Sequence, residues 1–215
     1  MSAADEENRF RSRYPDYNVL DNWSSPSWDD QTREVVRQRL EQVPPIRFFT
    51  SGEAALVGAI AERLVPQADR APDERVPIVA FIDEQLHEDR RSGYRYEGMP
   101  PQREAWRAGL AGMDSSSQHM YGRAFTALSG EEQDALLRRL QQGDPPGDAW
   151  ARLDAKRFFA NLLCETMVKA YYAHPLAWNE TGYHGPASPR GHVRKWIGGV
   201  DPWEPHERRT LWGTE

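Results

Sequence analysis

The sequence contains a single cysteine and no long hydrophobic run. Because Cys164 has no second cysteine to pair with among the 215 residues, this chain alone cannot form a disulfide, a cysteine-ligated zinc site or a cysteine-bound iron–sulfur cluster. Cys164 lies within an apolar helical run, which indicates a small buried side chain rather than a nucleophile. No apolar stretch approaches the ~20 residues of a membrane-spanning helix. We therefore expect no membrane span.

An excess of positive charge is also absent. Lys and Arg number 27 against 33 Asp and Glu, which gives a formal net charge of −6. Generic nucleic-acid binding depends on a basic stripe that displaces counterions, so we expect no nucleic-acid partner. The first 17 residues contain neither an apolar signal-peptide core nor a twin-arginine pair, and a cytoplasmic location is expected from the sequence as written.

Helical periodicity is present along most of the chain. Thr50 with Glu53 and Ser129 with Glu132 form capping boxes that predict two helix starts. The strongest apolar stripe runs over residues 154–175 and predicts a central core helix. The pattern of residues 101–129 predicts one helix, a break and a short second helix. We expect an all-α, single compact domain of about six or seven helices, with an irregular N-terminal arm and a long C-terminal loop and tail.

Residues with catalytic potential occur, but their spacing does not match an established site. The glycines at 182, 185, 191, 198 and 199 follow no strand and do not form a phosphate-binding loop. Ser115–Ser117 near His119 lack a nucleophile elbow, so we interpret the serines as a polar helix break. Asp83 and Glu84 are interpreted as an exposed helix flank. An alternative is a free-standing metal-dependent enzyme that uses His174, His184 and His192.

Aromatic residues are concentrated in the two irregular segments, residues 1–30 and 177–199. Long loops without secondary structure are uncommon unless they are functional or disordered, and their aromatic content argues against disorder. Trp, Tyr and Arg are the residue types that anchor protein interfaces. We predict no catalytic, cofactor-binding or metal-binding residues in this chain. The predicted partner interface consists of Trp23, Trp28, Trp178, Asn179, Tyr183, His184, Arg190, Arg194, Trp196, Trp203 and Trp212.

The order of several segments resembles the gluconate 2-dehydrogenase subunit 3 family over residues 46 to about 203. The segments are FFTSGEAALVGAIAERLVP, FIDEQL, FTALSGEEQDALL, FFANLLCETMVKAYYAHPLAWN and KWIGG. Phe48, Phe49, Thr50 and Glu53 match the start of the family's first helix, and Phe81, Ile82 and Asp83 match its F-I-D element. The family's P-x-x-G-G-N stretch matches His174-Pro175, Trp178 and Asn179, although the glycine pair is missing. Its W-x-x-I-G end matches Trp196, Ile197 and Gly198.

This resemblance implies a function for the chain. It implies an accessory small subunit without catalytic residues, which binds and stabilises a glucose-methanol-choline type flavoprotein. That partner would hold FAD and oxidise a sugar, sugar acid or polyol, and a cytochrome c is a further possible partner. A maturation chaperone for the flavoprotein is the alternative. Export with a partner would make the chain periplasmic or membrane-associated. The implied domains are residues 1–45 (arm and first helix), 46–203 (family domain) and 204–215 (tail).

Overall fold

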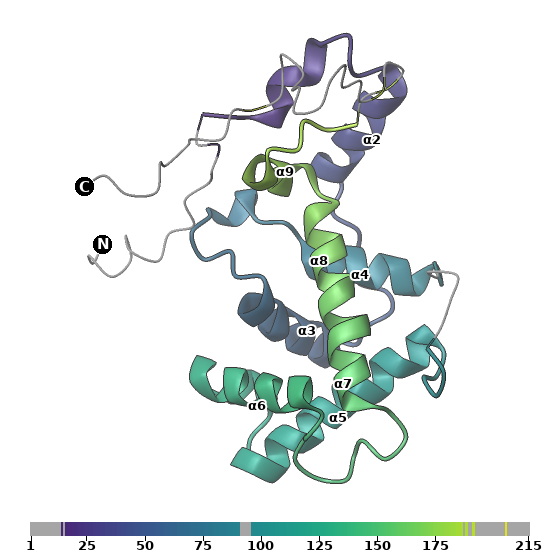
Figure 1. Ribbon diagram of the computed structural model, residues 1–215, viewed down its shortest axis with the longest axis vertical. Helices are drawn as coiled ribbons and strands as arrows, with labels where there is room; N and C mark the ends of the chain where they lie inside the picture. The colour runs from purple at the N-terminus through teal and green to yellow at the C-terminus, as the bar shows by residue number, and fades with distance from the viewer. Residues whose placement is uncertain are drawn as a thin grey trace, which may run out of the picture. The chain divides into compact units, whose positions relative to one another are not determined.

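The computed structural model describes residues 14, 16–90, 96–186, 188, 191 and 205 (Figure 1). Over these residues the regular structure is helical, with one isolated β-bridge between Trp28 and Ser188. The expected all-α class is confirmed. The elements are η1 (Val19–Ser24), α2 (Asp30–Glu41), α3 (Ser51–Leu64), η2 (Pro72–Glu74), α4 (Ile78–His87), α5 (Gln102–Tyr121), η3 (Phe125–Ala127), α6 (Gly130–Gln142), α7 (Ala155–Arg157), the π-helical η4 (Phe158–Cys164), α8 (Glu165–Tyr172) and α9 (Pro175–Thr181).

The chain folds into two compact units that interleave along the sequence. One, which we call the terminal unit, comprises residues 1–42, 69–76 and 172–215. The other, which we call the helical unit, comprises residues 43–68 and 77–171. The domain boundaries at residues 45 and 203 remain predictions. In the described ranges, no helix has the length and apolar character needed to cross a bilayer.

Local sequence signals account for the starts of α3 and α6 in the helical unit. Both predicted capping boxes form: Thr50 and Ser129 accept the N–H of Glu53 and Glu132, whose carboxylates in turn accept the N–H of the capping residue. These bonds satisfy backbone donors that a helix start otherwise leaves unpaired. Helix α6 ends at Gly143, whose φ of 80° lies in the left-handed region that glycine adopts without a steric penalty.

The core of the helical unit contains a row of aromatic side chains. Trp106 and Phe158 are fully buried, with ring centroids 6.1 Å apart. Phe49 packs edge-on against Trp106 at 5.8 Å, and Trp150 lies 5.8 Å from Phe158 on the other side. Edge-to-face pairs of this kind add to the stabilisation from apolar burial.

Two glycines on α5 make room for these rings. A Cβ atom at Gly109 would lie 2.2 Å from the ring of Phe158, and one at Gly112 would lie 2.9 Å from Trp150. Because the two positions are three residues apart, they share one face of the helix. The absence of side chains on this face therefore allows α5 to contact both rings directly.

Helix α5 continues through Ser115–Ser117, so the interpretation of these serines as a helix break is wrong. Ser116 and Ser117 are fully buried. The Ser116 hydroxyl donates to the Pro146 carbonyl (2.7 Å) and accepts the Trp150 indole N–H (2.9 Å), while the Ser117 hydroxyl donates to the carbonyl of Arg123 (2.6 Å). These partners satisfy the hydroxyls, which can therefore lie on a buried helix face. The helix instead ends at Gly122, in the left-handed region.

The strongest helix predicted from sequence is present as α7, η4 and α8, which follow one another without a break (Figure 1). Phe158, Phe159, Leu163 and Met167 form its buried side. Cys164 is partly exposed in this helix, and burial raises the pKa of its thiol to about 11. At neutral pH the thiol is therefore protonated, as expected for a small packed side chain.

The terminal unit contains more helix than the sequence indicated. Residues 1–30 were expected to lack helix, but Val19–Ser24 form the 3₁₀ turn η1. The loop expected from residue 177 begins later, because α9 covers Pro175–Thr181. Pro175 stands in the first turn of α9 and Gly182 follows its last residue with a φ of 66°, which are the preferred positions of these residues. Seven residues are too few to show helical periodicity.

Candidate partner interface

The described members of the predicted interface all lie in the terminal unit. They are Trp23, Trp28, Trp178, Asn179, Tyr183 and His184. Arg190, Arg194, Trp196, Trp203 and Trp212 lie outside the described residues. So do Ile197 and Gly198, which the sequence resemblance assigned to the family's W-x-x-I-G end.

Trp28 and Trp178 form the centre of an apolar cluster within the terminal unit. Their exposed fractions are 2 % and 7 %, and they pack with Val19 and Val36. Trp23 is partly buried at the edge of the cluster, with its ring centroid 5.9 Å from that of Trp28. The burial of Trp28 and Trp178 gives both indoles an intramolecular role, so they stabilise the chain's own fold.

Polar contacts join the N-terminal and C-terminal parts of this unit. The Asn179 side-chain oxygen accepts the N–H of Val19 at 2.8 Å. Ser188 pairs with the backbone on either side of Trp28: its N–H donates to the Ser27 carbonyl and its carbonyl accepts the N–H of Asp29, both at 2.9 Å. The Ser188 hydroxyl also donates to the Asp29 carboxylate at 2.7 Å.

Asp29 has two roles at this junction. It is the N-cap of α2 and accepts the N–H of Thr32 at 2.8 Å. Hydrogen bonds from Thr32 and Ser188 lower its pKa, so the carboxylate is ionised at neutral pH. One side chain thus begins α2 and holds the C-terminal segment against it.

Among the described members of the predicted interface, Tyr183 has the most clearly exposed side chain. Its exposed fraction is 39 %, and its ring packs edge-on against Trp178 at 5.2 Å. His184 follows it with a ring centroid 5.9 Å away and is itself buried. Partial burial raises the pKa of the Tyr183 hydroxyl, which is therefore neutral at physiological pH. Tyr183 is thus a partly exposed aromatic residue that packs against a buried indole.

Both ring nitrogens of His174 are occupied by the fold. As the N-cap of α9, His174 accepts the Leu176 N–H at Nδ1, and its Nε2 lies 2.8 Å from the Arg39 carbonyl. Nδ1 can accept a hydrogen bond only when it carries no proton, so the ring's proton is on Nε2, and this N–H donates to the Arg39 carbonyl. Burial lowers the pKa of His174, in agreement with a neutral ring. A metal at His174 would have to displace one of these bonds.

The His174, His184 and His192 metal alternative receives no support from the geometry of the described residues. Within the described ranges, no three His, Cys, Asp or Glu side chains converge as metal ligands. His192 lies outside those ranges.

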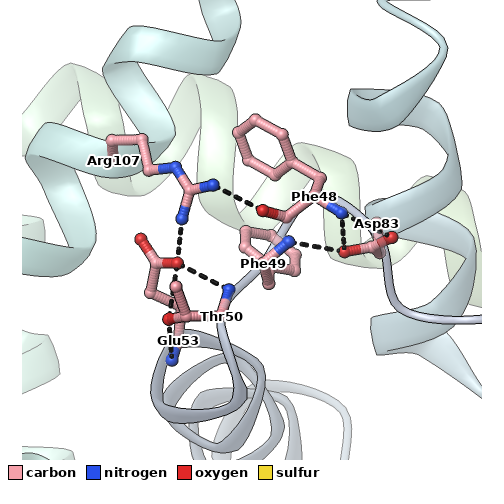
Figure 2. Close-up of polar contacts among 6 residues, drawn as sticks. All are labelled: Phe48, Phe49, Thr50, Glu53, Asp83 and Arg107. Atoms are coloured by element: carbon pink, nitrogen blue, oxygen red, sulfur yellow. Dashed lines mark hydrogen bonds and ion pairs between the residues drawn. The ribbon is translucent and has the colours of Figure 1, made fainter.

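A second arrangement, in the helical unit, involves the family-like residues of the FFT and F-I-D segments. The Asp83 carboxylate accepts hydrogen bonds from three successive backbone N–H groups, those of Arg47, Phe48 and Phe49, at 2.7–3.2 Å. Figure 2 shows the bonds from Phe48 and Phe49. Asp83 is fully buried, so the interpretation of Asp83 as an exposed helix flank is wrong. It lies four residues after Val79 and three before Leu86, on the inward face of α4, and the backbone donors compensate for its burial.

Arg107 extends this arrangement from α5. Its guanidinium binds the Glu53 carboxylate and the carbonyl of Phe48, and its Cζ lies 4.3 Å from the centroid of the Phe48 ring (Figure 2). Glu53 also closes the capping box of α3, so one carboxylate connects the helix start to α5. Sequence reasoning missed Arg107, since nothing in its local pattern marks a contact with residues more than 50 positions earlier.

These bonds give Asp83, Glu53 and Arg107 a structural role. Together they hold residues 47–50 in a fixed conformation ahead of α3. The polar groups of this arrangement are hydrogen-bonded to one another and to the backbone. A catalytic site would instead direct a reactive group toward a substrate.

The family model for gluconate 2-dehydrogenase subunit 3 matches residues 51–185. The chain belongs to the gluconate 2-dehydrogenase subunit 3 family. The match includes Glu53, Asp83 and Arg107 in the helical unit and His174, Trp178 and Asn179 in the terminal unit. Searches of the curated proteins and of the solved structures gave no match. The resemblance to this family is therefore confirmed, over a shorter range than the 46–203 expected from sequence.

The family name describes a subunit of a dehydrogenase. Residues 16–41, which supply Val19, Trp28 and Val36 to the cluster around Trp178, precede the matched range. Trp178, which lies within the matched range, therefore packs against residues that the family model does not include.

Proposed function

We propose that this chain is the non-catalytic small subunit of an FAD-dependent oxidoreductase that acts on the CH–OH group of a sugar, sugar acid or polyol. Its role is to bind and stabilise the large flavoprotein subunit, of the glucose-methanol-choline type. The observation that carries the proposal is the family match over residues 51–185, because the family name describes one subunit of a dehydrogenase complex.

The chemistry of the family-matched polar residues supports a structural role. The carboxylate of Asp83, the guanidinium of Arg107 and the imidazole of His174 each bind backbone groups of this chain. A general acid or base needs a free face toward substrate, and these groups are already engaged. In the proposed complex the reaction takes place in the partner. There the substrate C–H transfers a hydride to the flavin of FAD, while the hydroxyl proton passes to a base of the partner.

We expect the partner surface to include Tyr183. Its aromatic side chain is partly exposed and packs against the buried Trp178, and side chains of this type dominate interface energies. The predicted contacts of Arg190, Arg194, Trp196, Trp203 and Trp212 belong to the same proposal. Trp28 and Trp178 would contribute indirectly, by holding Tyr183 in place.

The test is purification of the tagged chain from its native host, followed by analysis of what it retains. We expect one flavoprotein chain for each copy of this chain, with the visible absorbance of bound flavin and with sugar- or polyol-oxidising activity. A haem absorbance band would add a cytochrome c to the complex. Recovery without a flavoprotein would refute the subunit role. If this chain binds the immature flavoprotein but is absent from the active enzyme, it is instead a maturation chaperone.

The interface itself is tested with a matched pair of variants. Tyr183→Ala should weaken the complex by about 2 kcal/mol, or roughly 30-fold in Kd, if the ring is an anchor. Tyr96→Ala is the control, because Tyr96 has nearly the same exposed fraction, 38 % against 39 %, and lies in the helical unit. Equal affinities of the two variants would remove Tyr183 from the interface.

A further inference from the structure

The segment that precedes the family-matched range packs along a segment near the C-terminal end of that range. We call Asp16–Glu41 the arm and residues 172–188 the receptor segment. The apolar part of their contact is the cluster of Val19, Trp28 and Val36 from the arm with Trp178 from the receptor segment. All four side chains are at least nine-tenths buried. Burial of such side chains is worth on the order of 1.5–3 kcal/mol each, before ordering costs.

Specific hydrogen bonds hold the arm at its beginning, middle and end. At the beginning, Asn179 accepts the N–H of Val19. In the middle, Ser188 pairs with Ser27 and Asp29. At the end, the Arg39 guanidinium donates to the Ala173 carbonyl at 2.6 Å, and the Arg39 carbonyl accepts from His174. The receptor segment therefore recognises the whole length of the arm and fixes its register.

The arm is connected to the helical unit by a linker that takes no part in these contacts. Residues 42–47 have no helical structure and contain Pro44-Pro45. Consecutive prolines favour an extended chain and prevent α2 from continuing. Val43 and Ile46 are 62 % and 43 % exposed, so the linker keeps two apolar side chains in water.

We propose that the receptor segment also binds the arm of a second copy of this chain, so that copies exchange arms and associate. Every contact between the arm and the receptor segment is available equally within one chain and between two chains. The linker favours exchange, because an extended Pro-Pro segment spans between copies and two adjacent linkers can bury Val43 and Ile46 against each other. The intramolecular arrangement is favoured by an effective concentration of about millimolar, so exchange should be evident as protein concentration approaches that range. This inference does not rest on the proposed dehydrogenase function.

The test uses disulfides that form efficiently when an arm lies on a receptor segment, above the background from random collisions. All variants are full-length and contain Cys164→Ala. One tagged chain carries Asp29→Cys and a differently tagged chain carries Ser188→Cys, at two side chains that contact each other at 2.7 Å. The two are mixed at about millimolar concentration, diluted and oxidised, and the disulfide between the two tags is quantified. The double variant Asp29→Cys/Ser188→Cys in one chain reports the intramolecular contact.

A collision control completes the design. Gln38→Cys, at an exposed position of α2, replaces Asp29→Cys in the same mixture with Ser188→Cys. We expect the Asp29–Ser188 mixture to give at least about tenfold more cross-linked heterodimer than this control, and the yield to fall when mixing is done at micromolar concentration. A yield no higher than the control, with the double variant forming its internal disulfide, would overturn arm exchange. Failure of the double variant to form that disulfide would overturn the contact on which the proposal is based.

Discussion

Replacing Asp83 with alanine should strongly destabilise the helical unit. The carboxylate is fully buried and accepts the N–H groups of Arg47, Phe48 and Phe49. Alanine leaves three backbone donors without a partner, and each buried unsatisfied donor costs about 1–3 kcal/mol. Because the three bonds share one carboxylate, their loss is not additive. We expect a total decrease of roughly 3–5 kcal/mol in the free energy of unfolding, a large part of a typical domain's stability.

Asp83→Asn should lie between the wild type and Asp83→Ala. The amide keeps the shape and one acceptor oxygen, but its NH₂ group faces backbone donors instead of accepting from them. The control is Glu84→Ala, since the neighbouring Glu84 makes partly exposed ion pairs with Arg90 and Arg47. Exposed pairs contribute only about 0–1 kcal/mol, so this variant should remain close to the wild type.

Two measurements separate these outcomes. Urea unfolding gives the change in stability, and amide hydrogen exchange at Phe48 and Phe49 reports the bonds directly. In Asp83→Ala these two amides should exchange faster than in Glu84→Ala. The reasoning is refuted if Asp83→Ala unfolds within about 1 kcal/mol of Glu84→Ala, or if the amides of Phe48 and Phe49 keep their protection.

Three further predictions concern other parts of the chain. Gly109→Ala should destabilise the helical unit by about 1–3 kcal/mol because the new Cβ overlaps the Phe158 ring, whereas Gly52→Ala, with no neighbouring atoms within 4 Å, should be neutral or stabilising; thermal denaturation of the two compares them. His174 has a lowered pKa in the folded state, so its contribution to stability should be present above about pH 6.5 and lost as the pH falls below that value, and His174→Gln should reduce this dependence in denaturant titrations at pH 7.5 to 5. Cys164, with a pKa of about 11, should react with iodoacetamide at pH 8 about 100-fold more slowly than an unperturbed thiol, and a rate equal to that of a free thiol would contradict its burial.

Features set by nearby residues were predictable from the sequence. The capping boxes at Thr50 and Ser129 depend on residues three positions apart, and both were predicted and are present. The apolar stripe of residues 154–175 likewise predicted the helix of α7, η4 and α8, because its buried side chains recur at helical spacing. The family resemblance depended on the order of such segments and is confirmed over residues 51–185.

Features that depend on distant residues were predicted poorly. Ser116 was interpreted as part of a helix break and Asp83 as an exposed flank because their buried partners, Pro146, Trp150 and residues 47–49, lie elsewhere in the chain. For Asp83 a signal was present, since a carboxylate between Val79 and Leu86 on an apolar helix face indicates a buried, satisfied group. Helix α9 also had a signal in Pro175 and Gly182, although it was too short for periodicity. The packing of Trp28 with Trp178 had no local signal.

The joining of the first and last parts of the chain in one unit also affects synthesis in the cell. Trp178 is 150 residues after Trp28, so a ribosome adding 5–20 residues per second takes about 8–30 s to produce the indole that completes the cluster. For most of that interval Val19, Trp28 and Val36 have been synthesised without the surface that will cover them. A nascent-chain chaperone that shields apolar segments would therefore act first on this region, long before any dehydrogenase subunit is encountered.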